Sequence, residues 1–203
     1  FNEYGMVGDR VVAIRDLRLG RLAGLRQYPA LARCRATAVD GTLVITLPDG
    51  QQLSIDDPGA AVAVGELLGT HVAIERLAPA AQLDAFRRRP DPEAAADPMG
   101  YLRTILGREA DEPLPDFAKF GPFVGEFETP PGSFVDCFPV LVITTSAVRS
   151  ISEALPDSVI DVRRFRPNLV VDTGGLEGHP EFGWAGQRLQ IGSVELDVVN
   201  DCP

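Results

Sequence analysis

The chain has 203 residues, 45% of them hydrophobic, and a formal net charge of -10. This length and apolar content are enough for a sizeable core in one domain or two small ones. No run approaches the ~18 apolar residues of a membrane span, and the acidic balance argues against nucleic acid, which binds surfaces of clustered Lys and Arg. We therefore expect a globular protein with no membrane and no nucleic acid among its partners.

The cysteines and histidines do not form a recognisable metal or disulfide pattern. Cys34, Cys137 and Cys202 are widely separated and include no Cys-x-x-Cys pair. This usage suits a reducing compartment, so we expect a cytoplasmic protein. His71 and His179 have no second histidine or cysteine at metal-ligand spacing, and we assign no metal ligand within the chain.

The first third of the chain predicts short strands separated by turns. Asp57 and Pro58 predict the N-cap and first residue of a helix that runs to about Leu68 and is stopped by Gly69. Asp-Gly pairs at 40–41 and 49–50 are typical of hairpins. A short helical turn is expected between Tyr28 and Arg35. The expected strands cover residues 11–14, 37–39, 42–47, 52–55 and 71–77.

The middle of the chain is richer in proline. Residues 90–98 are mostly Pro, Asp and Ala, which indicates a linker, and a short amphipathic helix is expected to follow from Met99 to Leu106. Residues 111–131 hold five prolines and four phenylalanines. We expect this irregular segment to cover the core, the alternative being the mouth of a pocket.

The last third begins with an apolar run at 137–143 that predicts a buried strand. Thr144, Thr145 and Ser146 follow it as a helix start, where hydroxyls and free N–H groups either bind an anion or simply cap the helix. Residues 148, 151 and 155 of that helix form an apolar stripe that should face the core. A hairpin is expected from segments 187–191 and 194–199.

An arginine cluster, Arg163, Arg164 and Arg166, reverses the overall charge locally. Pro167 disfavours the helical region for Arg166, so we expect an extended segment with alternating side chains. Arg164, Arg166 and Asn168 would then share one face and point into a common cavity that suits a planar anion. The alternative is that the arginines form surface ion pairs with some of the 29 acidic residues.

The string Arg-Arg-Phe-Arg-Pro-Asn-Leu-Val-Val at 163–171 resembles the signature of MOSC domains, named after the C-terminal part of molybdenum cofactor sulfurase. Similar stretches occur in the expected order at 5–10, 134–136, 139–146 and 184–192. The resemblance therefore extends over almost the whole chain. It is to bacterial proteins that combine an N-terminal region with a MOSC domain.

The resemblance implies a mainly β fold with a few helices (α+β). An N-terminal β-rich region would cover residues 1–78, a helical and irregular connector 79–130, and a MOSC-like β-barrel 131–203. Such proteins carry an earlier strand for the cofactor phosphate, and their molybdenum ligand is a cysteine that would lie two residues beyond Pro203. We therefore expect a chain that is truncated at both ends, with Cys202 out of register for the metal.

The resemblance also implies a function. It suggests a molybdenum-cofactor oxidoreductase that reduces N-hydroxylated compounds, with a small-molecule substrate and electrons from a redox partner protein or a missing electron-transfer domain. A non-catalytic carrier of the cofactor or of sulfur is the alternative, and an anion-binding domain without metal is a third. The residues expected to bind the organic part of molybdopterin are Arg10, Asp136, Thr144, Thr145, Ser146, Arg164, Arg166 and Asn168.

Overall fold

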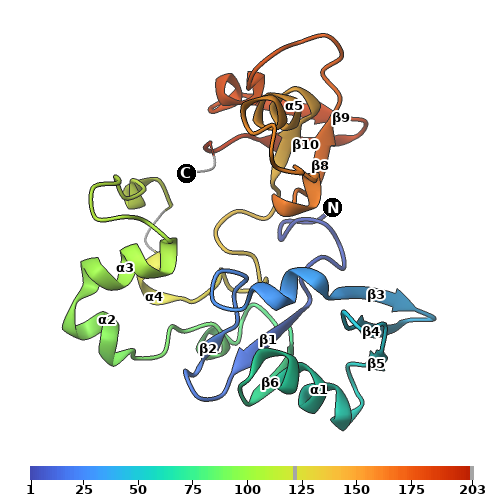
Figure 1. Ribbon diagram of the computed structural model, residues 1–203, viewed down its shortest axis with the longest axis vertical. Coiled ribbons are helices and arrows are strands. Elements are labelled where there is room, and N and C mark those ends of the chain that lie inside the picture. Colours follow the sequence, from blue (N-terminus) through green and yellow to red (C-terminus); the bar gives the residue numbers. More distant parts are fainter. Residues whose placement is uncertain (121–122, 202–203) are drawn as a thin grey trace. The chain divides into compact units, whose positions relative to one another are not determined.

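The computed structural model in Figure 1 describes residues 1–120 and 123–201. The chain divides into two compact units. Unit 1 consists of Phe1–Asp9 with Phe138–Pro203, and unit 2 of Arg10–Cys137. Each unit is built around its own sheets and helices. None of the helices in the described part has the length and apolarity needed to cross a membrane.

The first sheet of unit 2 has three antiparallel strands in the order β2-β1-β6. They are β1 (Val12–Asp16), β2 (Arg21–Leu22) and β6 (Val72–Arg76). The strand expected at 11–14 is longer than predicted, because Arg15 and Asp16 continue the ladder opposite Ala73 and Val72. These two charged residues are buried, so they belong to the interior of the unit.

The second sheet of unit 2 is the predicted meander, with order β3-β4-β5. It contains β3 (Arg35–Val39), β4 (Thr42–Thr46) and β5 (Gln52–Ser54), and the turn η1 (Pro29–Arg33) precedes it. Helix α1 (Pro58–Leu68) has the predicted ends: Asp57 accepts a hydrogen bond from the backbone of Gly59, and Gly69 is left-handed with φ 68°. The core cluster here is Ile45, Leu47, Val64 and Val72.

The proline-rich middle forms short helices. They are η2 (Leu83–Ala85), α2 (Pro92–Ala96), α3 (Pro98–Leu106), η3 (Phe117–Phe120) and α4 (Phe123–Glu126). The amphipathic helix after Pro98 is confirmed, and the expected linker contains a short helix of its own. Phe120 and Phe127 are each only 8% exposed, which agrees with a segment that covers the core.

Unit 1 is built on two parallel strands, β7 (Val142–Thr144) and β8 (Leu169–Val171). Helix α5 (Thr145–Ala154) starts directly after β7, while η4 (Val162–Arg164) comes before β8. The turn η5 (Pro180–Trp184) leads to the predicted hairpin of β9 (Arg188–Ile191) and β10 (Val194–Asp197).

Two local predictions for unit 1 are wrong in part. The strand expected from 137 to 143 begins only at Val142. The apolar stripe of α5 does not reach the core along its whole length, because Leu155 is 50% exposed and the buried residues of the helix are Ser146 and Ala147. The packed face is therefore at the first turn, where a helix that follows a strand directly is held closest to it.

The fold class is mixed α and β. Within residues 1–120 and 123–201 the strands make four sheets of two or three strands, and no closed barrel is found there. The MOSC-like barrel and the three-part domain division therefore stay predictions.

Candidate functional site

The arginine-rich turn of unit 1 is not extended, so the predicted alternation of side chains is wrong. Asp161 caps the turn η4 by accepting a bond from the backbone N–H of Arg163. Arg166 then takes a left-handed conformation, φ 52°, and its N–H donates to the carbonyl of Arg163 at 3.2 Å. Pro167 disfavours the right-handed helical region for Arg166, as expected. Arg166 takes the left-handed region instead of the extended one, and this conformation closes the turn.

The charges of this turn are used unequally. Arg163 forms an ion pair with Asp161, and the hydrogen bonds from Arg163 hold the pKa of Asp161 at about 2. Arg164 and Arg166 are exposed, and no hydrogen bond or ion pair to either guanidinium is found in the described part of the chain. The guanidiniums of Arg164 and Arg166 are therefore available to an anionic ligand. Arg163 instead forms a surface ion pair, which was the alternative for this cluster.

Asn168 connects three segments of unit 1. Its Oδ1 accepts a bond from the backbone N–H of Leu141 at 2.9 Å, and its own N–H donates to the carbonyl of Leu141 at 2.8 Å. Its Nδ2 donates to Oδ2 of Asp9 at 2.8 Å. The carboxamide thus fixes the start of the β7–β8 pair, and both of its polar atoms already have protein partners.

The first turn of α5 is a network of hydroxyl groups. Thr144 is the N-cap: its Oγ1 accepts from the N–H of Ala147 at 3.1 Å and lies 3.0 Å from Oγ of Ser146. Both side chains are buried, Thr144 at 0% exposed and Ser146 at 1%. Thr145 is partly exposed and donates to Asp172 at 3.2 Å. Of the three predicted hydroxyls, only that of Thr145 can be reached from solvent.

Two carboxylates of this network were missed by the sequence reasoning. Oε2 of Glu181 accepts a bond from Thr144 Oγ1 at 2.7 Å. Asp172 accepts from the N–H of Gly174 and from Thr145, and these bonds lower its pKa. The Asp-Thr-Gly run could have predicted the turn at Asp172. No local signal could have indicated Glu181, because its partner lies 37 residues earlier.

The register of β7 and β8 separates two groups of predicted site residues. Val142 pairs with Leu169 and Thr144 pairs with Val171. Asn168 therefore lies at the amino end of the ladder, and the α5 start lies at its carboxyl end beside Asp172. Asn168 and Asp172 are four positions apart along the strand, roughly 13 Å at ~3.3 Å per residue. A ligand that touched both groups would have to be extended along the ladder.

The family comparison covers this part of the chain. The model of the MOSC domain matches residues 129–203, which include the arginine turn, both strands and α5. This match agrees with the resemblance of the sequence motifs in this part of the chain to MOSC domains. Searches of curated proteins and of solved structures found no match to the chain.

The MOSC match makes the molybdenum cofactor the group to test against this donor set. Guanidiniums, a hydroxyl and backbone N–H groups suit the anionic organic part of such a cofactor. A thiolate for the metal is not among the described residues of unit 1, because Cys34 and Cys137 belong to unit 2. Burial also raises the pKa of the Cys34 thiol. The prediction that Cys202 is out of register for the metal concerns a residue outside the described ones.

Two further predicted site residues lie outside the MOSC strands, in unit 2. Arg10 lies two residues before the first residue of β1, is left-handed with φ 47°, and is partly buried. Asp136 is exposed in the irregular segment that ends unit 2. The cofactor-binding roles of both stay predictions, as does a shared cavity with Arg164 and Arg166.

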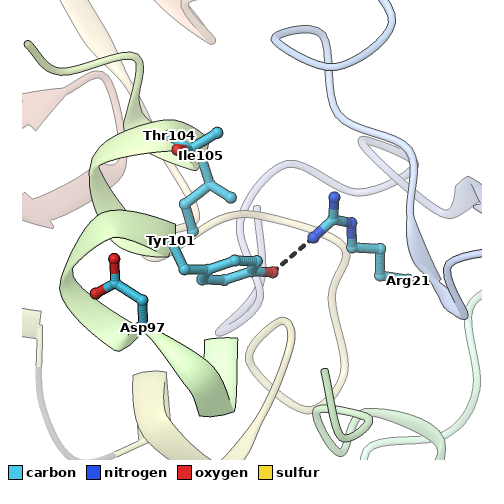
Figure 2. A pocket seen from close by; sticks show the side chains of 5 residues that line it. All are labelled: Arg21, Asp97, Tyr101, Thr104 and Ile105. Atoms are coloured by element: carbon cyan, nitrogen blue, oxygen red, sulfur yellow. Dashed lines mark hydrogen bonds between the residues drawn. The ribbon is translucent and has the colours of Figure 1, made fainter. Parts of the chain in front are cut away.

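Unit 2 also contains a polar hollow that the sequence did not predict, shown in Figure 2. It has a volume of about 230 Å³ and lies against α3. Tyr101 points toward Arg21, whose Nη1 donates to the phenol oxygen at 2.6 Å and to Asp91 at 3.1 Å. The guanidinium also lies 5.7 Å from the centre of the Tyr101 ring. These contacts join β2 to the helical segment.

Proposed function

We propose that this protein binds the molybdenum cofactor through its MOSC domain and reduces N-hydroxylated compounds with electrons from an external donor. The observation that carries the proposal is the pair of exposed guanidiniums at Arg164 and Arg166, which make no hydrogen bond in the described part of a segment matched by the MOSC family. The reductase activity itself rests on the resemblance of the sequence motifs to MOSC-containing reductases.

The residues have different tasks in this proposal. Arg164 and Arg166 would hold the cofactor's anionic groups, with the planar guanidinium fork suited to phosphate oxygens. The start of α5 at Thr145 would offer the positive end of the helix dipole, while the Thr145 hydroxyl itself donates to Asp172. Asn168 would act indirectly, because its bonds to Leu141 and Asp9 keep the arginine turn against the strands.

When bound, the cofactor would supply the two-electron, oxygen-atom chemistry. The protein would orient it, neutralise part of its charge and provide the substrate's surroundings. The metal-ligand cysteine expected two residues beyond Pro203 stays a prediction.

The test measures cofactor content before activity. The full-length protein would be purified from a host that makes the cofactor, and its pterin and molybdenum would be quantified. The pterin content of the double variant Arg164→Gln with Arg166→Gln should be at least about tenfold lower than that of the wild type, since the loss of even one charge-assisted bond costs ~1.5 kcal/mol or more. Arg35→Gln, which removes one exposed arginine of β3, is the control for loss of a positive charge elsewhere and should retain the wild-type amount.

The activity assay then separates the two candidate functions. Turnover of a hydroxylamine or an amidoxime with an artificial electron donor would support the oxidoreductase. Stoichiometric cofactor without turnover would favour the carrier, and a protein without pterin or molybdenum would refute both. Pterin content that is equal in the double variant and in the wild type would refute the role of the arginine pair.

A further inference from the structure

A second hollow of unit 2, with a volume of about 350 Å³, lies between α1, η1 and the turn that joins β4 to β5. This volume is at the lower end of the roughly 300–1,000 Å³ range of small-molecule sites. It is larger than the hollow of Figure 2, whose arginine is already bonded to Asp91 and Tyr101. The larger hollow is therefore the better candidate for a ligand site.

The floor of this hollow is apolar and firmly held. Leu47 is only 7% exposed and belongs to the core cluster with Val64. Ala63 and Leu67 also line the hollow. Both are partly buried and pack against that cluster. They are four residues apart on α1, so they lie on one face of the helix. An apolar group that enters would meet a rigid surface.

The rim carries charges of both signs. Arg33 ends η1, Glu66 is on the same face of α1 as Ala63, and Asp49 is in the β4–β5 turn. Asp49 is held in place because its Oδ1 accepts the N–H of Gln51 at 2.9 Å. In the part of the chain that the structure describes, no ion pair is found for Arg33, Asp49 or Glu66. One cation and two carboxylates thus surround an apolar floor without neutralising one another.

A ligand that carries both signs of charge matches this lining better than a ligand with a single sign. An anion at Arg33 would also meet two carboxylates, and a simple cation at the carboxylates would meet Arg33. A zwitterion with an apolar body satisfies all three groups. Its carboxylate would take the guanidinium fork, its ammonium would take the two carboxylates, and its body would cover the floor.

We propose that this hollow binds a free α-amino acid with an apolar side chain. The ligand's carboxylate pairs with Arg33, its ammonium with Glu66 and Asp49, and its side chain packs on Leu47 and Leu67. None of the residues that line the hollow is among those predicted to bind the cofactor, so the proposal does not rest on the cofactor function proposed above.

The test is a titration of the whole chain with L-leucine, followed by backbone amide NMR. Saturable shifts are expected around residues 47–51 and 63–67 at up to about 100 mM ligand, a range that covers a Kd of about 1 mM and one that is tenfold weaker. N-acetyl-leucine lacks the ammonium and leucinamide lacks the carboxylate. Each should bind at least about tenfold more weakly, the loss of one charge-assisted contact. Glycine, which has no apolar body, should give no saturable shift.

Single variants test which residue binds the carboxylate of the ligand and which binds its ammonium. Arg33→Gln should weaken leucine binding by about tenfold and leave the weak binding of leucinamide unchanged. Glu66→Gln should weaken leucine and leave N-acetyl-leucine unchanged. Arg35→Gln makes the same charge change outside the hollow and should bind leucine as the wild type does.

Three results would overturn the proposal: no saturable shift with leucine, leucinamide that binds as tightly as leucine, or an Arg33→Gln variant that keeps the wild-type affinity for leucine. If a variant fails to fold, the comparison of the four ligands on the wild-type chain still tests whether the hollow requires the carboxylate, the ammonium and the apolar side chain.

Discussion

Replacing Asp16 by alanine should destabilise unit 2 strongly, because this carboxylate is fully buried and serves several donors. It accepts bonds from the backbone N–H groups of Arg18 at 2.7 Å and Leu19 at 3.0 Å, and from the hydroxyl of Tyr28. A fourth donor, Thr70, lies at 3.4 Å and contributes little. Three charge-assisted bonds at a net ~1–1.5 kcal/mol each give an expected cost of about 3–5 kcal/mol.

The matched control is Asp57→Ala. Asp57 is also an aspartate that accepts a backbone bond, from Gly59 at 2.7 Å, but it is exposed at the start of α1. Its loss should cost about 1 kcal/mol, as for other N-caps. The assay is urea unfolding followed through NMR signals of unit 2, since a chain of two units need not unfold in one step. Equal costs for the two variants would refute the energetic role given to burial at Asp16.

A comparison of the wild type with Asp16→Ala also tests how the stability of unit 2 depends on pH. Burial opposes ionisation of Asp16, but the bonds from Tyr28, Leu19 and Arg18 outweigh it and lower its pKa below 3.8. Because the folded pKa is lowered, the stabilisation is complete above the unfolded value of about 3.9 and is lost as the pH falls through the folded pKa. The difference in free energy of unfolding between the wild type and Asp16→Ala should therefore become smaller below about pH 3.8. A gap that stays constant on acidification would contradict this account.

Three further predictions concern unit 1. Thr144→Val should lower its stability by about 1–2 kcal/mol through loss of the α5 cap, measured by urea unfolding, and Thr145→Val should cost less because that side chain is partly exposed. Arg166→Gly should change stability by less than about 1 kcal/mol, whereas Arg166→Val should cost more than that at a left-handed position; equal thermal shifts would contradict the φ of 52°. In an NMR titration the carboxyl of Asp161 should titrate near pH 2, and Arg163→Gln should raise its pKa toward 3.8.

The predictable parts of the fold are those whose causes lie within a few residues. The ends of α1 follow from an Asp-Pro pair and from Gly69, which takes the left-handed conformation at no steric cost. The β3–β4–β5 meander follows from two Asp-Gly turns. The arginine turn shows the limit of such rules, because Pro167 disfavours the right-handed helical region for Arg166 and favours an extended one, yet Arg166 is left-handed in the folded turn.

The candidate site depended on contacts between distant segments. The sequence indicated which side chains carry charge, and the MOSC signature marked the segment that contains the arginine turn. The structure separated Arg163, which a local ion pair with Asp161 neutralises, from its two neighbours. It also assigned Asn168 to Leu141 and Asp9, and Thr144 to Glu181. Local patterns determine turns and caps because their partners are adjacent in the chain, whereas the partner of a buried polar group is chosen when separate segments pack together.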